Sequence, residues 1–266
     1  MIREPMRQSL RIAMLGDFDP QKHSHWATEA ALFHAATWLG FDVEPRWFST
    51  EALESRDAQD FLAHFDGLWG APGSPFRSSA GMLRGIEFAR QRDLPYLGTC
   101  AGFQYALIEF TRNVLGLRDA DTAENNSDSR NIVVTPVACP MPQRPADGPQ
   151  TNNPKMHGED AVHPVKGTLM HELCRSDALQ GQYFCNFETN PEYVARWEAS
   201  GLRVSARGPR KEMRAFDLPD RRFFLATLFQ PQLSSRAEQP HPIVLGYLRA
   251  CAEFRASKKA AMARSV

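Results

Sequence analysis

The chain of 266 residues lacks several features that would assign it to a large functional class. Lysine and arginine together number 31, as do aspartate and glutamate, so the formal net charge is zero and nothing attracts nucleic acid or an anionic membrane. No apolar run reaches the length of a transmembrane helix or, near Met1, of a secretory signal. No GxxxxGK(S/T) phosphate loop is present either. We therefore predict neither a nucleic-acid partner, nor a membrane partner, nor a nucleotide site.

Paired cysteine motifs are missing as well. The five cysteines are odd in number and irregularly spaced, and they form no CxxC pair and no zinc pattern. His157 and His163 stand apart from any carboxylate or cysteine at ligand spacing, so we interpret them as solvated loop residues. These absences predict a reducing, cytoplasmic location and a protein with no metal and no organic cofactor.

The apolar pattern predicts an α/β protein. Short buried strands are expected at Leu10–Leu15 and Phe65–Gly70, and helices at Trp26–Leu39 and Gly81–Gln91. Strands that alternate with helices predict a three-layer, open, mostly parallel sheet with helices on both faces, as in flavodoxin-like folds. Ligands in such folds bind at the carboxyl ends of the strands.

No second hydrophobic core or internal repeat is visible, so we predict a single domain over residues 1–266. Seven prolines fall between positions 136 and 164, and we expect a flexible loop excursion at 138–160. Further on, we expect a strand at Tyr183–Glu188, and a final helix at Pro242–Phe254 with a frayed basic tail after it.

A cysteine stands where a strand is expected to turn into a helix. Leu94–Leu97 reads as a buried strand, and apolar residues recur at helical spacing from Phe103 onward. Cys100 lies between them with Gly98 and Gly102 two residues away on either side, which is typical of a nucleophile elbow. The N–H groups that begin the helix favour the thiolate form. A lone cysteine is more often a buried structural residue, but the two glycines favour the nucleophile.

The loop after Gly70 is expected to meet this elbow, because both follow strands of one sheet. A backbone N–H near Gly73 or Ser74, together with that of Ala101, would form an oxyanion hole beside Cys100. A plain turn explains the loop's Pro-Gly-Ser-Pro sequence equally well.

Three segments of the sequence carry a family resemblance. They are RQRDLPYLGTCAGFQYALIEFTRNVLG from Arg90, NPEYVARWEASGLRVS from Asn190, and Phe223–Ser235 with HPI at His241. Through them nearly the whole chain resembles the class I (triad) glutamine amidotransferases, most nearly the glutaminase domain of the CTP synthase branch. The synthase domain of that branch has no counterpart in this chain.

The resemblance implies specific roles for residues of this chain. Cys100 would attack the side-chain amide of glutamine and form a thioester that water cleaves, releasing ammonia. Gly73 and Ala101 would donate to the oxyanion, and Ser74 would lie on the substrate side of the same loop. Gln104 and Glu124 would contact the substrate, Glu124 by pairing with its α-ammonium group.

The sequence departs from the family at two places. Gln230 and Gln232 stand where the family has the His and Glu of its triad, and a carboxamide neither accepts a proton near neutral pH nor carries charge. Asn186 and Phe187 stand where the related domain has an Arg-Tyr pair that holds the substrate carboxylate. His241 would reach Cys100 only through a rearranged loop.

Two hypotheses from different classes remain open. One is an enzyme that uses Cys100 on an amide, thioester or related carbonyl substrate, with ordinary glutaminase turnover weak or lost. The other is a non-catalytic pseudo-amidotransferase that binds a small amide or amino-acid-like ligand, or docks on a synthase-type protein partner.

Overall fold

The computed structural model describes residues 8–138 and 156–264. Its helices are α1 (His23–Leu39), α2 (Ala58–Leu62), α3 (Ser79–Gln91), α4 (Ala101–Asn113), α5 (Leu169–Cys174), α6 (Val194–Ala199) and α7 (Pro242–Arg264). Its strands are β1 (Ser9–Leu15), β2 (Asp42–Phe48), β3 (Gly67–Gly70), β4 (Tyr96–Thr99), β5 (Asp121–Thr122), β6 (Ile132–Pro136), β7 (Met156–Pro164), β8 (Leu179–Cys185), β9 (Phe187–Thr189), β10 (Arg203–Arg207), β11 (Met213–Asp217) and β12 (Phe224–Thr227).

The described strands form one large sheet and one small sheet. The large sheet has nine strands in the order β2-β1-β3-β4-β12-β11-β10-β7-β8. From β2 to β12 neighbouring strands are parallel, and from β12 to β8 they are antiparallel. The expected three-layer α/β class is therefore confirmed, with the parallel strands confined to one half of a mixed sheet.

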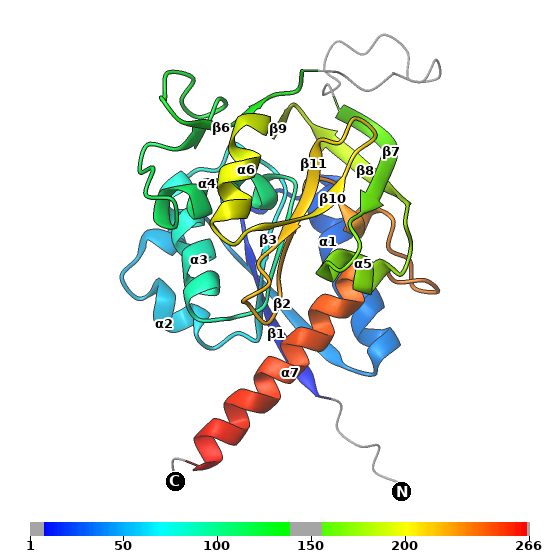
Figure 1. Cartoon of the computed structure of the whole chain (residues 1–266). Helices are drawn as coiled ribbons and strands as arrows, with labels where there is room; N and C mark the ends of the chain where they lie inside the picture. Colours follow the sequence, from blue (N-terminus) through cyan, green and yellow to red (C-terminus); the bar gives the residue numbers. More distant parts are fainter. Residues whose placement is uncertain (1–7, 139–155, 265–266) are drawn as a thin grey trace, which may run out of the picture.

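Helices cover both faces of the large sheet (Figure 1). On one side α3 packs against α4, and on the other α1 packs against α7. Every residue of β3, β4 and β12 is buried, as expected for central strands covered on both faces. The Ser78 Oγ caps α3 by accepting a hydrogen bond from the Gly81 N–H at 2.9 Å.

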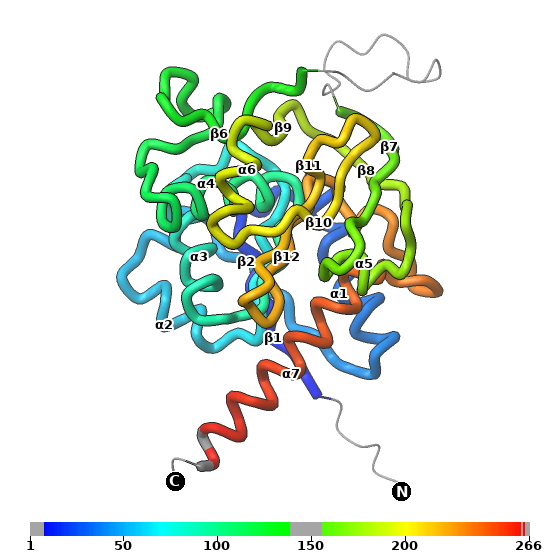
Figure 2. Tube along the Cα trace, in the orientation of Figure 1, coloured from blue at the N-terminus to red at the C-terminus, as the bar shows by residue number. Residues whose placement is uncertain are grey.

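The small sheet has the order β5-β6-β9 and lies beside α4 and α6, as the chain trace shows (Figure 2). The chain passes from the large sheet to the small one at Asn186, between β8 and β9. The expected single strand at Tyr183–Glu188 is therefore two strands that belong to different sheets.

Other expectations are corrected at the ends of elements. Residues 139–155 of the predicted excursion lie outside the described residues, and strand β7 occupies 156–164, so both His157 and His163 lie on a strand. The last helix continues to Arg264, where we had expected a frayed tail after Phe254. Basic residues near the C-terminus of a helix stabilise it by interacting with the helix dipole, which is consistent with the added turns.

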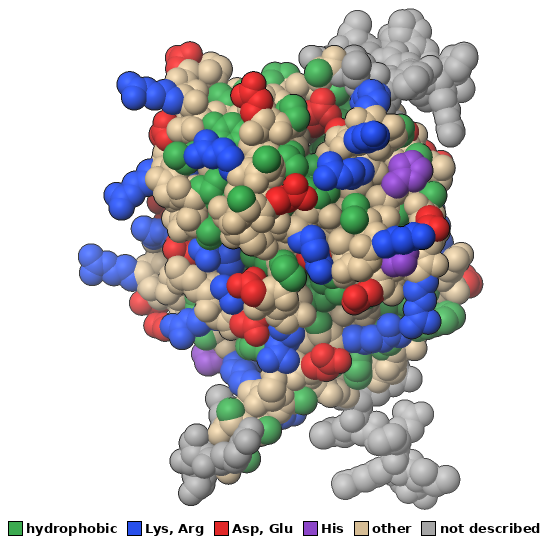
Figure 3. All heavy atoms as spheres, in the orientation of Figure 1, with side chains coloured by type: hydrophobic (Ala, Val, Ile, Leu, Met, Phe, Trp, Pro, Cys, Tyr) green, Lys and Arg blue, Asp and Glu red, His purple; other side chains and the backbone are tan. Residues whose placement is uncertain are grey.

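Charged side chains of both signs are interspersed over the face in Figure 3, in keeping with the zero net charge. No described helix combines the length and the apolar character needed to cross a membrane.

Candidate active site

Cys100 occupies the turn between the central strand β4 and helix α4. Its backbone has φ +52° and ψ −106°, a conformation that side-chain-bearing residues rarely adopt. Such a residue costs about 1–3 kcal/mol and persists where its surroundings hold it, most often at functional sites. The side chain is 6% exposed. The predicted elbow is present, with its sulfur just below the surface.

The two flanking glycines allow the turn to pack against its neighbours. A Cβ atom on Gly102 would overlap the carbonyl group of Gly70 at the end of β3, and one on Gly98 would lie 2.8 Å from the Gly102 oxygen. The Tyr96 hydroxyl donates to that same oxygen at 2.9 Å. Backbone therefore rests directly on backbone at both positions, and any side chain there would push the elbow away from the sheet.

The loop after β3 lies next to the elbow and is anchored by the start of α1. Gly73 has φ +114°, and its carbonyl accepts a hydrogen bond from the Lys22 ammonium group at 3.3 Å. The buried His25 accepts from the Asp19 N–H at Nδ1, while its Nε2 lies 3.0 Å from the Pro72 oxygen and donates to it. Burial lowers the pKa of His25, which keeps the ring neutral in this position.

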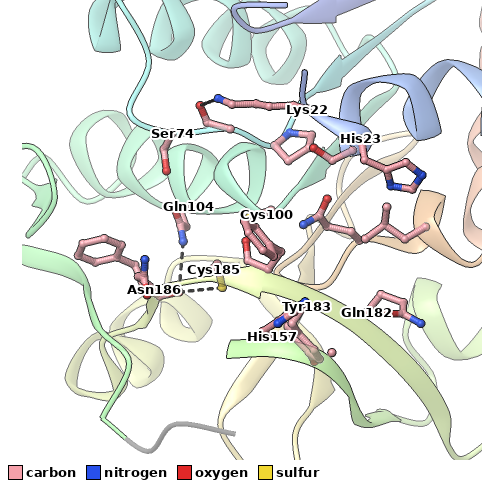
Figure 4. Close-up of a pocket in the computed structure, with 18 of the residues that line it drawn as sticks. Lys22, His23, Ser74, Cys100, Gln104, His157, Gln182, Tyr183, Cys185 and Asn186 are labelled. Atoms are coloured by element: carbon pink, nitrogen blue, oxygen red, sulfur yellow. Dashed lines mark hydrogen bonds between the residues drawn. The ribbon is translucent and has the colours of Figure 1, made fainter. Parts of the chain in front are cut away.

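A cavity of about 520 Å³ opens between the elbow, this loop and the junction of β8 with β9 (Figure 4). It brings together most of the predicted site residues: Gly73, Ser74, Cys100, Gln104, Glu124, Asn186, Phe187 and Gln230. Ala101 and Gln232 do not line it. Ala101 is fully buried as the first residue of α4, so its N–H has no acceptor within the helix and stays a candidate oxyanion donor.

Gln230, which lines the cavity, and Gln232, which does not, are each 2% exposed. The Gln230 N–H donates to the Gln182 oxygen at 2.8 Å, which fixes the residue against β8. The Gln232 Nε2 donates to the Gln230 Oε1 at 3.4 Å and to the Thr99 Oγ1 at the same distance. With its oxygen accepting, the Gln230 carboxamide is left with an NH₂ donor and no base for the cavity.

Two other polar side chains that line the cavity, Gln104 and Glu124, differ in their hydrogen-bond partners. The Gln104 Nε2 donates to the Phe187 carbonyl at 3.2 Å, so this side chain fastens the start of β9. The Oε2 of Glu124 is buried and has no hydrogen-bond partner among the described residues. A buried carboxylate oxygen without a partner is costly, and a ligand that donates a hydrogen bond or carries a positive charge would remove that cost.

Comparison with known proteins agrees with this geometry. A family model described as glutamine amidotransferase class-I matches residues 25–166, which is more than half of the chain. The chain belongs to this family.

Curated CTP synthases are similar to this amidotransferase over most of its length. The protein of Pyrococcus abyssi is 32% identical over 96% of this chain and 47% of its own length, and that of Saccharolobus solfataricus is 29% identical over 93% and 46%. The chain therefore spans about half the length of these relatives. Among solved structures, the glutaminase domain of Trypanosoma brucei CTPS with bound acivicin superimposes with a TM-score of 0.81 at 27% identity, covering 92% of this chain and 94% of that one.

Several residues of the amidotransferase pocket were missed by sequence reasoning. They are Gln21, Lys22, His23, Ser24, Pro72, His157, Gly158, Gln182, Tyr183, Phe184, Cys185 and Leu233. The first four were open to prediction, because they follow the end of β1 and therefore reach the same sheet edge as Gly73 and Cys100. Pro72 belongs to the loop after β3 and was open to prediction for the same reason. The others come from the antiparallel half of the sheet or its connections, whose arrangement no local pattern reveals.

No described histidine forms a hydrogen bond with the Cys100 sulfur, whose one hydrogen bond to the backbone is to the Phe184 carbonyl at 3.8 Å. His23 and His157 line the cavity, and His157 packs its ring edge-on against Phe184. His241 lies outside the cavity and accepts the Ile243 N–H at its Nδ1, at the start of α7. It is not the base of this amidotransferase site.

His241 is expected to make the stability of the amidotransferase depend on pH. Burial lowers its pKa from 6.5 to about 4, so between these values the unfolded chain takes up a proton that the folded chain does not. The free energy of unfolding should therefore be greatest above pH 6.5 and fall as the pH drops toward 4. Urea titrations at several pH values would measure this loss, and His241→Gln should reduce it.

His64 is exposed, and His64→Gln supplies the matched control. An unchanged loss of stability in the His241 variant would contradict the assignment to this residue.

Proposed function

We propose that this CTP-synthase-type amidotransferase retains Cys100 as a nucleophile, hydrolyses glutamine weakly or not at all, and acts on another amide or carbonyl substrate. The observation that carries the proposal is one cavity in which Cys100, on a turn of positive φ, shares the lining with Gln230. The sulfur has a nucleophile's position, while its expected proton acceptor is a carboxamide.

The first half of acyl transfer remains chemically reasonable in this pocket. The Cys100 sulfur attacks the substrate carbonyl carbon, and the resulting oxyanion meets the backbone N–H groups of Gly73 and Ala101. The leaving group then departs and leaves a thioester on Cys100. An amine leaves poorly unless a general acid protonates it, whereas a thiolate leaves unaided. The missing acid therefore favours thioesters and other substrates with stable leaving groups over simple amides.

Charged groups in the cavity favour an amino-acid-like ligand. The unpartnered Oε2 of Glu124 suits an ammonium group. Lys22 is the one lysine or arginine among the described lining residues, and it suits a carboxylate in place of the arginine that relatives are expected to have at position 186. Its Nζ already lies on the Gly73 loop, next to the proposed oxyanion hole.

Labelling with acivicin tests the nucleophile, because the similar Trypanosoma brucei domain binds this electrophilic glutamine analogue. We expect intact-mass measurement to find one adduct on the parent chain and none on Cys100→Ser. Cys174→Ser is the matched control and should be labelled like the parent, since burial raises the pKa of the Cys174 thiol to about 11 and keeps it unreactive.

A second, non-catalytic function is favoured by the buried hydrogen bond between Gln232 and Gln230, which holds the site in shape without acid–base chemistry. In that case the chain is a regulatory pseudo-amidotransferase that binds a small amide or docks on a synthase-type partner. Calorimetry should then detect binding of glutamine, glutamate or another small amide without turnover. If Cys100 is no more reactive than free cysteine, the enzyme hypothesis is wrong. Measurable turnover of any of these compounds would contradict the non-catalytic hypothesis.

A further inference from the structure

The cavity contains a second cysteine that the proposed acyl transfer does not use. Cys185 is the last residue of β8, just before the chain crosses to the small sheet, whereas Cys100 comes from the β4–α4 turn. Both are free thiols, both line the cavity, and they are 8% and 6% exposed. Figure 4 labels both residues among those that line the cavity.

Both side chains lie against the same stretch of backbone. The Cys100 sulfur lies 3.8 Å from the carbonyl oxygen of Phe184, the residue before Cys185. The Cys185 sulfur lies 3.5 Å from the Phe187 oxygen, to which it donates. The neighbouring Cys100 thiol and burial raise the pKa of Cys185. Cys185 is therefore a protonated thiol beside Cys100.

The position of Cys185 differs from that of a cysteine that only fills space in the hydrophobic core. Cys251 shows what such a residue is like in this chain: it is fully buried in the core and does not line the cavity. Cys185 lines a cavity instead, and it shares this cavity with Cys100. Two thiols side by side at an accessible site are the arrangement in which one sulfur is oxidised and the other resolves it.

We propose that Cys100 and Cys185 form a redox pair that a hydroperoxide converts into a disulfide inside the cavity of the candidate active site. The proposal shares with the proposed function only the nucleophilic sulfur of Cys100. It adds an oxidant class, a second reacting residue and a modified state of the site.

The chemistry balances in two steps. The Cys100 thiolate attacks the terminal oxygen of the hydroperoxide, the O–O bond breaks, and the alcohol or water leaves with one proton from solvent, so that Cys100 becomes a sulfenic acid. The Cys185 thiol then attacks the Cys100 sulfur; an S–S bond forms, the S–O bond breaks, and the hydroxide leaves as water with the Cys185 proton. A dithiol reductant reverses the result and is itself oxidised to a disulfide.

Closing the pair changes what the site can do. The Cys100 sulfur is bonded to Cys185 and is no longer available as a thiolate to form a thioester, and the end of β8 becomes covalently joined to the elbow. Acyl transfer therefore stops in the oxidised state and returns on reduction. Solvent reaches the pair through the cavity itself, so a small hydroperoxide needs no other route.

Peptide mapping of the full chain tests the pair directly. The reduced protein is treated with one equivalent of hydrogen peroxide, blocked with iodoacetamide and digested with trypsin without reductant. Cleavage after Arg92, Arg112, Arg175 and Arg196 isolates the two thiols on separate peptides, each with a single cysteine. We expect these peptides to appear joined, with a mass about 2 Da below their sum, and to separate on reduction.

Variants identify the part played by each sulfur. Cys185→Ser should lose the joined peptides and leave Cys100 as a sulfenic acid that dimedone traps, while Cys100→Ser should lose both products. Cys174→Ser, with the pair intact, should behave like the parent. Cys185→Ala, checked by its urea midpoint, repeats the test if the serine variant folds poorly.

The outcome is separable from that of acivicin labelling. Acivicin adducts on Cys100 without joined peptides would overturn the redox pair and leave the proposed function standing. Joined peptides without acivicin adducts would do the reverse. A Cys100 joined equally to Cys174 or Cys251 would show random oxidation and would also overturn the pair.

Discussion

Replacing both carboxamides by the family's acid–base pair, as Gln230→His with Gln232→Glu, is expected to raise glutamine hydrolysis by roughly 10²–10⁴-fold. The site is prepared for this exchange. Residue 230 lines the cavity with Cys100, and its backbone is fixed by the hydrogen bond to the Gln182 oxygen. Residue 232 already donates to the side chain at 230, at 3.4 Å. A glutamate at that place would accept the imidazole N–H and orient the ring.

Ammonia release from glutamine measures the gain, and the same double variant carrying Cys100→Ser is the control, which should stay silent. A third substitution, Asn186→Arg, examines substrate capture. It should lower the KM of the double variant by restoring a charge-assisted contact to the glutamine carboxylate. If neither variant releases ammonia, the difference between this chain and a glutaminase does not lie in these positions.

Gly102→Ala is expected to destabilise the fold by about 3 kcal/mol, the upper end of what overpacking usually costs. The new methyl group would overlap the Gly70 carbonyl, a backbone group at the end of β3 that has no rotamer to escape into. The elbow and β3 would have to separate, so acivicin labelling of Cys100 should fall together with stability. Urea titration gives the change in the free energy of unfolding.

Gly85→Ala is the matched control, because it also lies inside a helix of thirteen residues. Its new Cβ would come within 2.7 Å of the Leu15 Cδ1, the end of a flexible side chain that can rotate away. Gly85 lies in the helix interior, where alanine gains about 1 kcal/mol of helix propensity, whereas Gly102 is the second residue of α4. An equal loss of stability in the two would mean that contact with Gly70 backbone is not what makes Gly102 necessary.

The parallel half of the fold was open to prediction from the sequence. The run before Cys100, the glycines around it and the helical spacing after it are all local, and each reports the geometry of a few neighbouring residues. The carboxyl-edge rule then placed Gly73 and Cys100 together without knowledge of any long-range contact. Whether each predicted site residue has the role assigned to it stays a prediction.

The antiparallel half of the fold could not be predicted from the sequence. Cys185 faces Cys100 only because β8 pairs with β7 and the chain changes sheets at Asn186, and neither event leaves a mark on the local pattern. An apolar run at Tyr183–Glu188 reads the same whether it is one strand or two. The polar sequence of residues 51–64 likewise predicts one exposed helix, whereas the structure has a 3₁₀ turn at Ala52–Glu54 and the five residues of α2.

The two walls of the cavity have very different places in the fold. Cys100 follows β4, which lies in the middle of the sheet between β3 and β12. Cys185 and Asn186 stand at the end of β8, the outermost strand of the same sheet. Because β8 pairs with β7 alone among the described strands, one wall of the cavity is held at the margin of the sheet and the other at its centre.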